Sequence, residues 1–106
     1  MSDTETRQKL VDFLERKAFR PVLEAEPGRY PEGKRASLAD VQRRTETEIQ
    51  RFRNYRSAQE VVTNFRRDLN SDAAQKVHRE LKALGLPTVN DVRTEFEELA
   101  GSLGVK

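Results

Sequence analysis

Apolar side chains return every three or four positions along most of this 106-residue chain, which is the period of an α-helix. No stretch of four to eight residues alternates apolar and polar positions with β-branched enrichment, so no strand is predicted. Capping residues, prolines and glycines divide the pattern into segments. The sequence therefore predicts an all-α fold, a compact bundle of four to five helices over about 4–20, 38–54, 58–69, 72–84 and 89–103, with one long loop over 24–36.

The first helix is expected to begin after Asp3 or Thr4, because either side chain accepts hydrogen bonds from free N–H groups at a helix start. Its apolar face consists of Leu10, Val11, Leu14 and Ala18. Pro21 is expected to end or kink this helix, since proline has no N–H and its ring clashes with the preceding turn. Two prolines and two glycines within residues 26–36 then predict the long loop.

The middle of the chain carries two apolar faces that one straight helix cannot bury together. Ser37 and Asp40 have the spacing of a capping box for a helix whose apolar face is Leu38, Val41, Thr45, Ile49 and Phe52. At about 100° per residue, the next apolar face lies roughly 150° away around the helix; it consists of Val61, Val62, Phe65 and Leu69. A break is therefore predicted at 54–57, where Ser57 and Glu60 offer a second capping box.

Two more helices follow. Asn70, Ser71 and Asp72 are expected to end one helix and cap the next, and Gly85 is expected to adopt the left-handed conformation that ends it. The last helix is expected to begin near Thr88 or Asn90. The predicted apolar faces of these two helices are Ala73, Ala74, Val77, Leu81 and Leu84, and then Val92, Phe96, Leu99 and Leu103.

Length and composition fit one helical domain over 1–106 with a modest core. Charged residues make up 36% of the chain and the mean hydropathy is −0.86, so we expect self-association, as a homodimer, to bury additional apolar surface. No uninterrupted apolar run exists, which predicts neither a signal peptide nor a membrane span. We therefore expect a soluble, cytoplasmic protein that does not bind membranes.

Few residues are suited to catalysis or metal binding. The chain has no cysteine and one histidine, His78, which we expect to be half-buried at a helix edge with a local hydrogen bond. Gly28 to Lys34 has the G-x-x-x-x-G-K spacing of a phosphate-binding loop, but Arg35 stands where that loop needs Ser or Thr, and no strand precedes it. The sequence thus predicts no enzyme, no cofactor and no metal site.

The segment from Lys34 to Arg67 is basic, with nine basic and four acidic residues, and eight of the nine are arginines. Such a segment could contact nucleic-acid phosphates. The same side chains could instead form ion pairs along a helix, since Asp40, Arg44 and Glu48 are four apart and Glu48 is three before Arg51. The ion-paired interpretation is favoured, and phosphate contact by residues 35–67 stays as the alternative.

Taken together, the pattern favours an interaction module that binds another protein or a second copy of itself. The residues expected to contact a protein partner or phosphate are Tyr30, Arg35, Arg44, Arg51, Tyr55 and Arg56. For Tyr30 a second interpretation is preferred, in which the ring folds down to cover a helix end.

Overall fold

In the computed structural model, which describes residues 1–106, the chain is helical and contains no strand. A π-helix, η1 (Glu15–Phe19), joins α1 to α2 without a gap, so the elements make five helical segments and the predicted all-α bundle is confirmed. A single 3₁₀ turn, η2 (Pro27–Arg29), lies before α3. The helices are α1 (Asp3–Leu14), α2 (Arg20–Leu23), α3 (Glu32–Arg53), α4 (Ala58–Leu69), α5 (Asp72–Ala83) and α6 (Arg93–Ser102).

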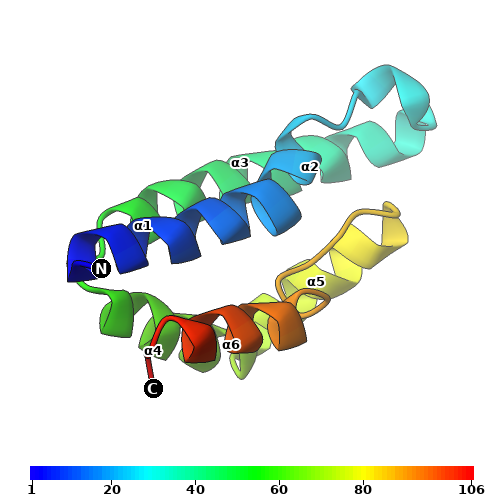
Figure 1. Cartoon of the computed structure of the whole chain (residues 1–106). Helices are drawn as coiled ribbons and strands as arrows, with labels where there is room; N and C mark the ends of the chain where they lie inside the picture. Colours follow the sequence, from blue (N-terminus) through cyan, green and yellow to red (C-terminus); the bar gives the residue numbers. More distant parts are fainter.

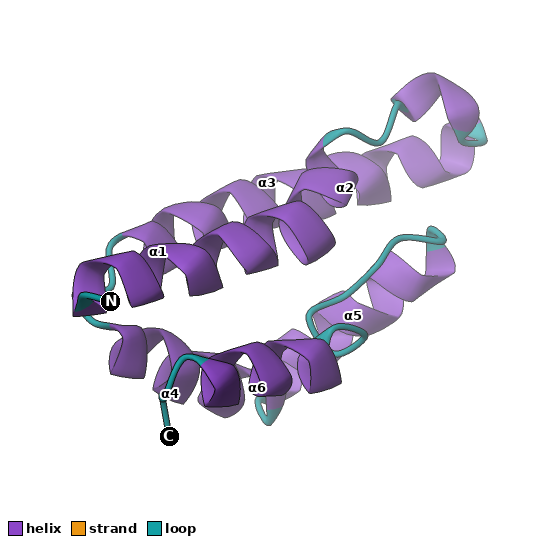
Figure 2. Cartoon of the chain, in the orientation of Figure 1, coloured by secondary structure: helices purple, strands orange, loops and turns teal.

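The helices form two layers in a molecule that measures 47 × 23 × 20 Å (Figure 1). The first layer consists of α1, η1 and α2 together with the long helix α3, which lies beside them. The second layer consists of α4, α5 and α6, with a short turn between α4 and α5 and a long loop over residues 84–92 between α5 and α6 (Figure 2). Both ends of the chain lie at the same end of the bundle, whereas α5 and the start of α3 extend toward the opposite end.

The first helix begins one residue earlier than predicted. Ser2 is its N-cap, and its Oγ accepts a hydrogen bond from the Glu5 N–H at 3.1 Å. The assignment of Asp3 or Thr4 as the cap is therefore wrong, because Asp3 already lies in the first turn. An acidic residue is also stabilised there by the positive end of the helix dipole.

Pro21 does not end the helix, and the predicted end at residue 20 is wrong. The residues before it form the π-helix η1, in which the Arg20 N–H donates to the Glu15 carbonyl, and this wider turn leaves more room for the proline ring than an α-helical turn does. The Glu24 N–H still donates to the Arg20 carbonyl at 2.9 Å, so the helix continues through Leu23. Its continuation buries Val22, which is 1% exposed.

The predicted loop is too long at its C-terminal end. α3 begins at Glu32 rather than near residue 38, and the Lys34 N–H donates to the Pro31 carbonyl at 2.9 Å. The Ser37–Asp40 capping box is therefore wrong. Pro31 supplies a fixed φ just before the helix, and the Lys34 ammonium donates to the Ala83 carbonyl at 3.1 Å, which ties the added turn to the end of α5.

The other predicted boundaries are largely confirmed. Ser57 and Ser71 cap α4 and α5, each accepting a backbone N–H bond at 3.1 Å. Gly85 has φ +71° and ends α5 with the Leu86 N–H bonded to the Leu81 carbonyl at 2.9 Å. The last helix begins at Arg93, later than predicted, because Thr88 and Asp91 exchange hydrogen bonds in a separate turn before it.

The core is divided into two hydrophobic clusters. The larger joins α1, η1, α4, α6 and the end of α3, with the rings of Phe65 and Phe96 stacked at 4.0 Å between centroids. The smaller joins α2 and the first half of α3 to the end of α5, and it consists of Val22, Leu38, Val41, Leu81 and Leu84. The predicted apolar faces of α3 and α4 are buried throughout.

Helix α5 is the exception to this burial. Of its predicted apolar face, Leu81 and Leu84 are buried, but Ala73 is exposed and Ala74 and Val77 are only half-buried. The predicted apolar face is therefore buried only at its C-terminal end, and the prediction is wrong for Ala73, which is exposed. Val77 packs partly against the smaller cluster, whereas Ala74 is only half-buried and Ala73 is exposed, so the bundle covers the first half of α5 incompletely.

Candidate functional site

A groove of about 450 Å³ runs along the incompletely covered face of α5, and we call it the α3–α5 groove. It lies between the two core clusters, since its lining includes Phe19 of the larger cluster and Leu81 of the smaller one. The loop after α5 contributes Pro87, Thr88 and Val89. A volume of this size lies within the roughly 300–1,000 Å³ range of ligand-binding clefts.

Two apolar walls face each other across the α3–α5 groove. Ala18, Phe19 and Val22 come from the first layer, because the continued helix around Pro21 carries them there. Ala73, Ala74 and Val77 come from α5, where helical spacing places them on one face. The groove therefore has the composition of a site for apolar groups.

His78 also lines the α3–α5 groove, and it is half-buried as predicted. Its Nδ1 is buried without a hydrogen-bond partner, so the local bond expected from the sequence is not formed at this atom. Burial lowers the pKa of His78 below its usual value, although the charge of Asp91 acts in the opposite direction. The imidazole is therefore held in its neutral form at neutral pH.

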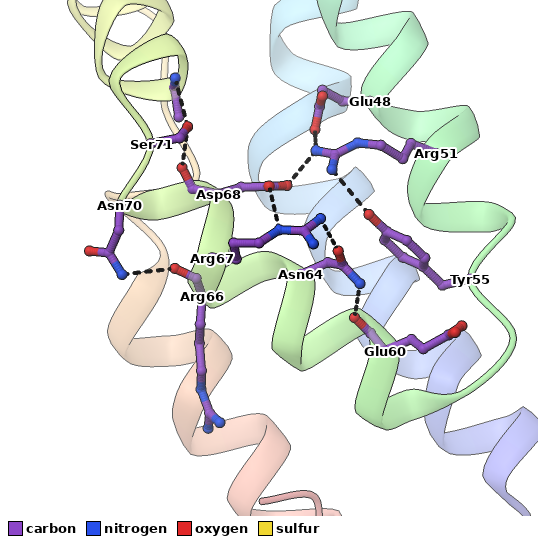
Figure 3. A network of polar contacts seen from close by, with 11 residues as sticks. Glu48, Arg51, Tyr55, Glu60, Asn64, Arg66, Arg67, Asp68, Asn70 and Ser71 are labelled. Carbon is purple, nitrogen blue, oxygen red and sulfur yellow. Dashed lines mark hydrogen bonds and ion pairs between the residues drawn. The ribbon is translucent and has the colours of Figure 1, made fainter.

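Arg51 stands at one end of the groove and makes three side-chain contacts (Figure 3). Its guanidinium donates to the carboxylates of Glu48 and Asp68, and Nη1 donates to the Tyr55 hydroxyl at 3.0 Å. Burial lowers the pKa of Arg51, but the hydrogen bonds to Asp68 and Glu48 raise it more, and the net shift is upward. Arg51 therefore carries its charge at every accessible pH.

Asp68 extends this contact from α3 toward α5. Its carboxylate accepts from Arg51, while its backbone carbonyl accepts from the Ser71 hydroxyl at 2.9 Å. Ser71 is also the residue that caps α5. Figure 3 shows these side chains in one network that joins α3, α4 and the start of α5, and Arg51, Asp68 and Ser71 of this network line the groove.

The structure brings together only some of the predicted contact residues. Arg44 and Arg51 line the groove, and Tyr55 lies beside Arg51. The Arg44 Nε is 3.2 Å from the Asp40 carboxylate, so this predicted ion pair is formed. Arg56 lies in the turn between α3 and α4, outside the groove, and its side chain has no hydrogen bond or ion pair.

Tyr30 and Arg35 lie apart from the groove, at the far end of the bundle. The Tyr30 hydroxyl donates to the Leu84 carbonyl at 2.9 Å, which confirms the interpretation that its ring covers a helix end. Arg35 Nε donates to the carbonyls of Pro27 and Tyr30, both at 3.2 Å. These two side chains therefore stabilise the loop before α3 and its contact with α5.

Most arginines of the basic segment are bound to acceptors within the chain. Glu48–Arg51 is formed as predicted from helical spacing, but other pairs join separate helices. Arg53 pairs with the buried carboxylate of Glu15, and Arg66 makes two bonds of 2.9 and 2.7 Å to Glu97. Spacing along one helix carries no signal for these long-range pairs, which explains why sequence reasoning missed them.

No protein-family model, curated protein or solved structure matches this chain. No helix is long and apolar enough to cross a bilayer, and no three His, Asp or Glu side chains gather as ligands for a metal ion. The α3–α5 groove is therefore interpreted from its own residues.

Proposed function

We propose that this protein is an interaction module that holds an apolar segment of a partner protein in the α3–α5 groove. The observation that carries the proposal is the incompletely covered first half of α5, where Ala73, Ala74 and Val77 line a groove. An amphipathic helix that lays its apolar side chains between two helices is a common mode of recognition. The small alanine side chains leave room for larger side chains of a partner.

The charges around the groove favour an uncharged occupant. Its charged lining consists of Arg44 and Arg51 against Glu48 and Asp68, so the two signs balance. Arg44 is paired with Asp40, and Arg51 with both acids of the lining. A charged ligand would lose hydration without gaining an unpaired counter-charge, whereas an apolar side chain has no such cost.

A different protein is a better partner than a second copy of this chain. Met1 is the one large hydrophobic residue that is exposed, at 70%. The folded chain therefore has no exposed helix face of large apolar side chains with which to fill the groove of another copy. Homodimer formation stays a prediction, and the mass in solution decides it.

The test is a selection of helical peptides from a random library against the folded protein. We expect the selected peptides to carry apolar side chains at i, i+3, i+4 and i+7 and to bind in the groove. Ala73→Glu places a charge in the groove and should weaken binding at least tenfold. Ala39→Glu is the matched control, because Ala39 is also an exposed helical alanine but does not line the groove.

Equal binding to the two variants, or a selection that yields no helical peptide, contradicts the proposal. Sedimentation at increasing protein concentration tests the second copy separately. If the protein forms a dimer that Ala73→Glu dissociates and Ala39→Glu leaves intact, the occupant of the groove is a second copy of this chain and not a different protein.

The nucleic-acid alternative has weaker support. Of the arginines between 35 and 67, Arg56 alone has no side-chain hydrogen bond or ion pair, and the others are held by carboxylates, an amide or backbone carbonyls. Phosphate contact requires cations that are free to displace counterions. We expect no retarded band with single- or double-stranded DNA or RNA at low salt. A band that weakens as salt is added would favour the nucleic-acid alternative over the interaction module.

A further inference from the structure

Helix α5 takes part in only one of the two core clusters. The 16 residues of the larger cluster include none from α5, whereas Leu81 and Leu84, at its C-terminal end, belong to the smaller cluster. Its first half borders the α3–α5 groove, with Val77 partly packed against the smaller cluster. The larger cluster therefore does not require α5, and a segment with so few buried contacts is able to open while the rest of the chain stays folded.

Two side chains from the first layer hold the C-terminal end of α5, at the end of the bundle opposite the two termini (Figure 1). The Tyr30 hydroxyl donates to the Leu84 carbonyl at 2.9 Å. The Lys34 ammonium donates to the Ala83 carbonyl at 3.1 Å. Carbonyls in the last turn of a helix have no partner within the helix, and a positive charge is favourable beside them. We call Tyr30 and Lys34 the latch, because they tie this end of α5 to the start of α3 and the turn before it.

The N-terminal end of α5 is tied to α4 instead. A short turn joins the two helices, and the Ser71 hydroxyl donates to the Asp68 carbonyl at 2.9 Å. The side-chain amide of Gln75 donates to the Leu69 carbonyl at 2.7 Å. The C-terminal end is followed by Gly85, with φ +71°, and by the loop over residues 84–92. Separation of α5 from α3 is therefore expected to begin at the latch, with the turn after α4 as the hinge.

The position of α5 against α3 leaves part of the helix unsatisfied. Nδ1 of His78, on α5, is the only buried side-chain nitrogen or oxygen in the molecule without a hydrogen-bond partner. An unpaired buried polar atom destabilises the state that buries it, and water pairs with the atom once it is exposed. The groove beside Ala74 and Val77 likewise leaves these side chains without packing partners on one side. Both features lower the cost of moving α5 away from α3.

We infer that α5 is a flap over the α3–α5 groove, which separates from α3 when the latch of Tyr30 and Lys34 opens and so admits a helix of the partner protein. This inference rests on the proposed function and adds how the groove is entered. An α-helix with its side chains is about 10–12 Å across. In the latched position Leu81 of α5 shares the smaller cluster with Leu38 and Val41 of α3, so this end of the groove has no room for a helix.

Thiol labelling measures the opening, because the chain has no cysteine and one introduced thiol is then the only reactive site. Val41→Cys places a thiol in the smaller cluster, and Val61→Cys is the matched control in the larger cluster, since both valines are 0% exposed. We expect Ellman's reagent to label Val41→Cys about tenfold faster or more, because opening of α5 exposes it without global unfolding. Its rate should also rise less steeply with urea, since less surface is exposed.

Equal rates and equal urea dependence in the two variants would overturn the flap. Circular dichroism and urea denaturation show that each variant is folded and how stable it is. If Val41→Cys does not fold, Val22→Cys is the second reporter, because Val22 belongs to the smaller cluster from α2 and is 1% exposed.

Tyr30→Phe tests the latch, because it removes the hydroxyl and keeps the ring. It should raise the ratio of the Val41→Cys rate to the Val61→Cys rate about threefold, the effect of one net hydrogen bond. Tyr55→Phe is the matched control, since its hydroxyl also has one hydrogen bond, from Arg51, but lies outside the latch. It should leave the ratio unchanged. An unchanged ratio in Tyr30→Phe, or an equal rise in both variants, would show that Tyr30 does not latch α5.

Binding of the helical peptides selected against the groove tests entry through the latch. Tyr30→Phe should bind them about threefold more tightly, because a larger fraction of the chain is then open. Equal or weaker binding would overturn this route of entry, and the groove would keep its proposed function. If no peptide binds, the proposed function and the entry of a partner fail together, whereas the labelling rates decide separately whether α5 opens.

Discussion

Arg51 on α3 and Asp68 on α4 lie 17 residues apart in the chain and form an ion pair at the end of the α3–α5 groove (Figure 3). Their side chains are 33% and 25% exposed, so solvent screens this pair less than it screens the exposed pairs of Asp40 with Arg43 and Arg44. Arg51 also holds Glu48 and the hydroxyl of Tyr55. One guanidinium thus fixes the position of α4 relative to α3.

A double-mutant cycle with Arg51→Met and Asp68→Asn measures this contact. We expect a coupling of about 1 kcal/mol in the free energy of unfolding, because the pair is partly shielded and joins two helices. Urea denaturation of the four proteins gives the value. The exposed pair Asp40–Arg43 on α3 is the control and should couple less; equal coupling in both cycles would contradict a special role for Arg51.

Substitutions in the larger core cluster should cost far more than substitutions in the groove. Phe96 is fully buried and stacks on Phe65, so Phe96→Ala should lower the free energy of unfolding by about 3–5 kcal/mol. Val77 is half-buried and borders open volume, so Val77→Ala should cost about 1 kcal/mol or less. The urea denaturation midpoints of the two variants measure these losses of stability. A loss for Val77→Ala close to that for Phe96→Ala would mean that the groove is closed in solution.

Much of this fold follows from local rules. The phase difference between the face of Leu38 and that of Phe65 predicted the break that Ser57 caps, because rotation per residue is a property of the backbone alone. The continuation of the helix past Pro21 and the start of α3 at Glu32 could not be predicted from these local rules. Both depend on tertiary contacts, with Val22 buried under α3 and Lys34 bonded to the end of α5.

The candidate site was much less predictable than the fold. Ala73, Ala74 and Val77 have the periodicity of a core face, and periodicity does not tell whether another element covers that face. The one local signal was size, since two alanines fill little space beside the leucines at the other end of α5. The pairing of Arg51 with Asp68 required knowledge of how α3 and α4 cross, which spacing within a helix does not contain.

The pair Arg66–Glu97 predicts an acid-sensitive contribution to stability. Hydrogen bonds from Arg66 lower the pKa of Glu97 below its ordinary value of 4.5. The unfolded state therefore binds the proton first, so this stabilisation is complete above pH 4.5 and is lost as the pH falls through the folded-state pKa.

Urea midpoints measured between about pH 6 and pH 3 test this sign, since that window spans the titration of carboxylates. The wild-type protein should lose more stability across the window than Glu97→Gln, which has no carboxylate to protonate. Glu98→Gln is the matched control, because Glu98 is exposed and has no ion pair, and it should follow the wild type. An equal loss in the wild type and Glu97→Gln would show that the pair adds nothing.

His78 gives a direct measurement of the groove, because it is the only histidine and its ring protons titrate without overlap. Burial lowers its folded-state pKa below 6.5, so the NMR midpoint of the folded chain should lie below that of the same chain in urea. By the same sign, its contribution to stability is complete above pH 6.5 and declines as the pH falls toward the folded midpoint. His78→Asn should remove that decline from the urea midpoints, and identical folded and unfolded titrations would mean that the ring is solvated.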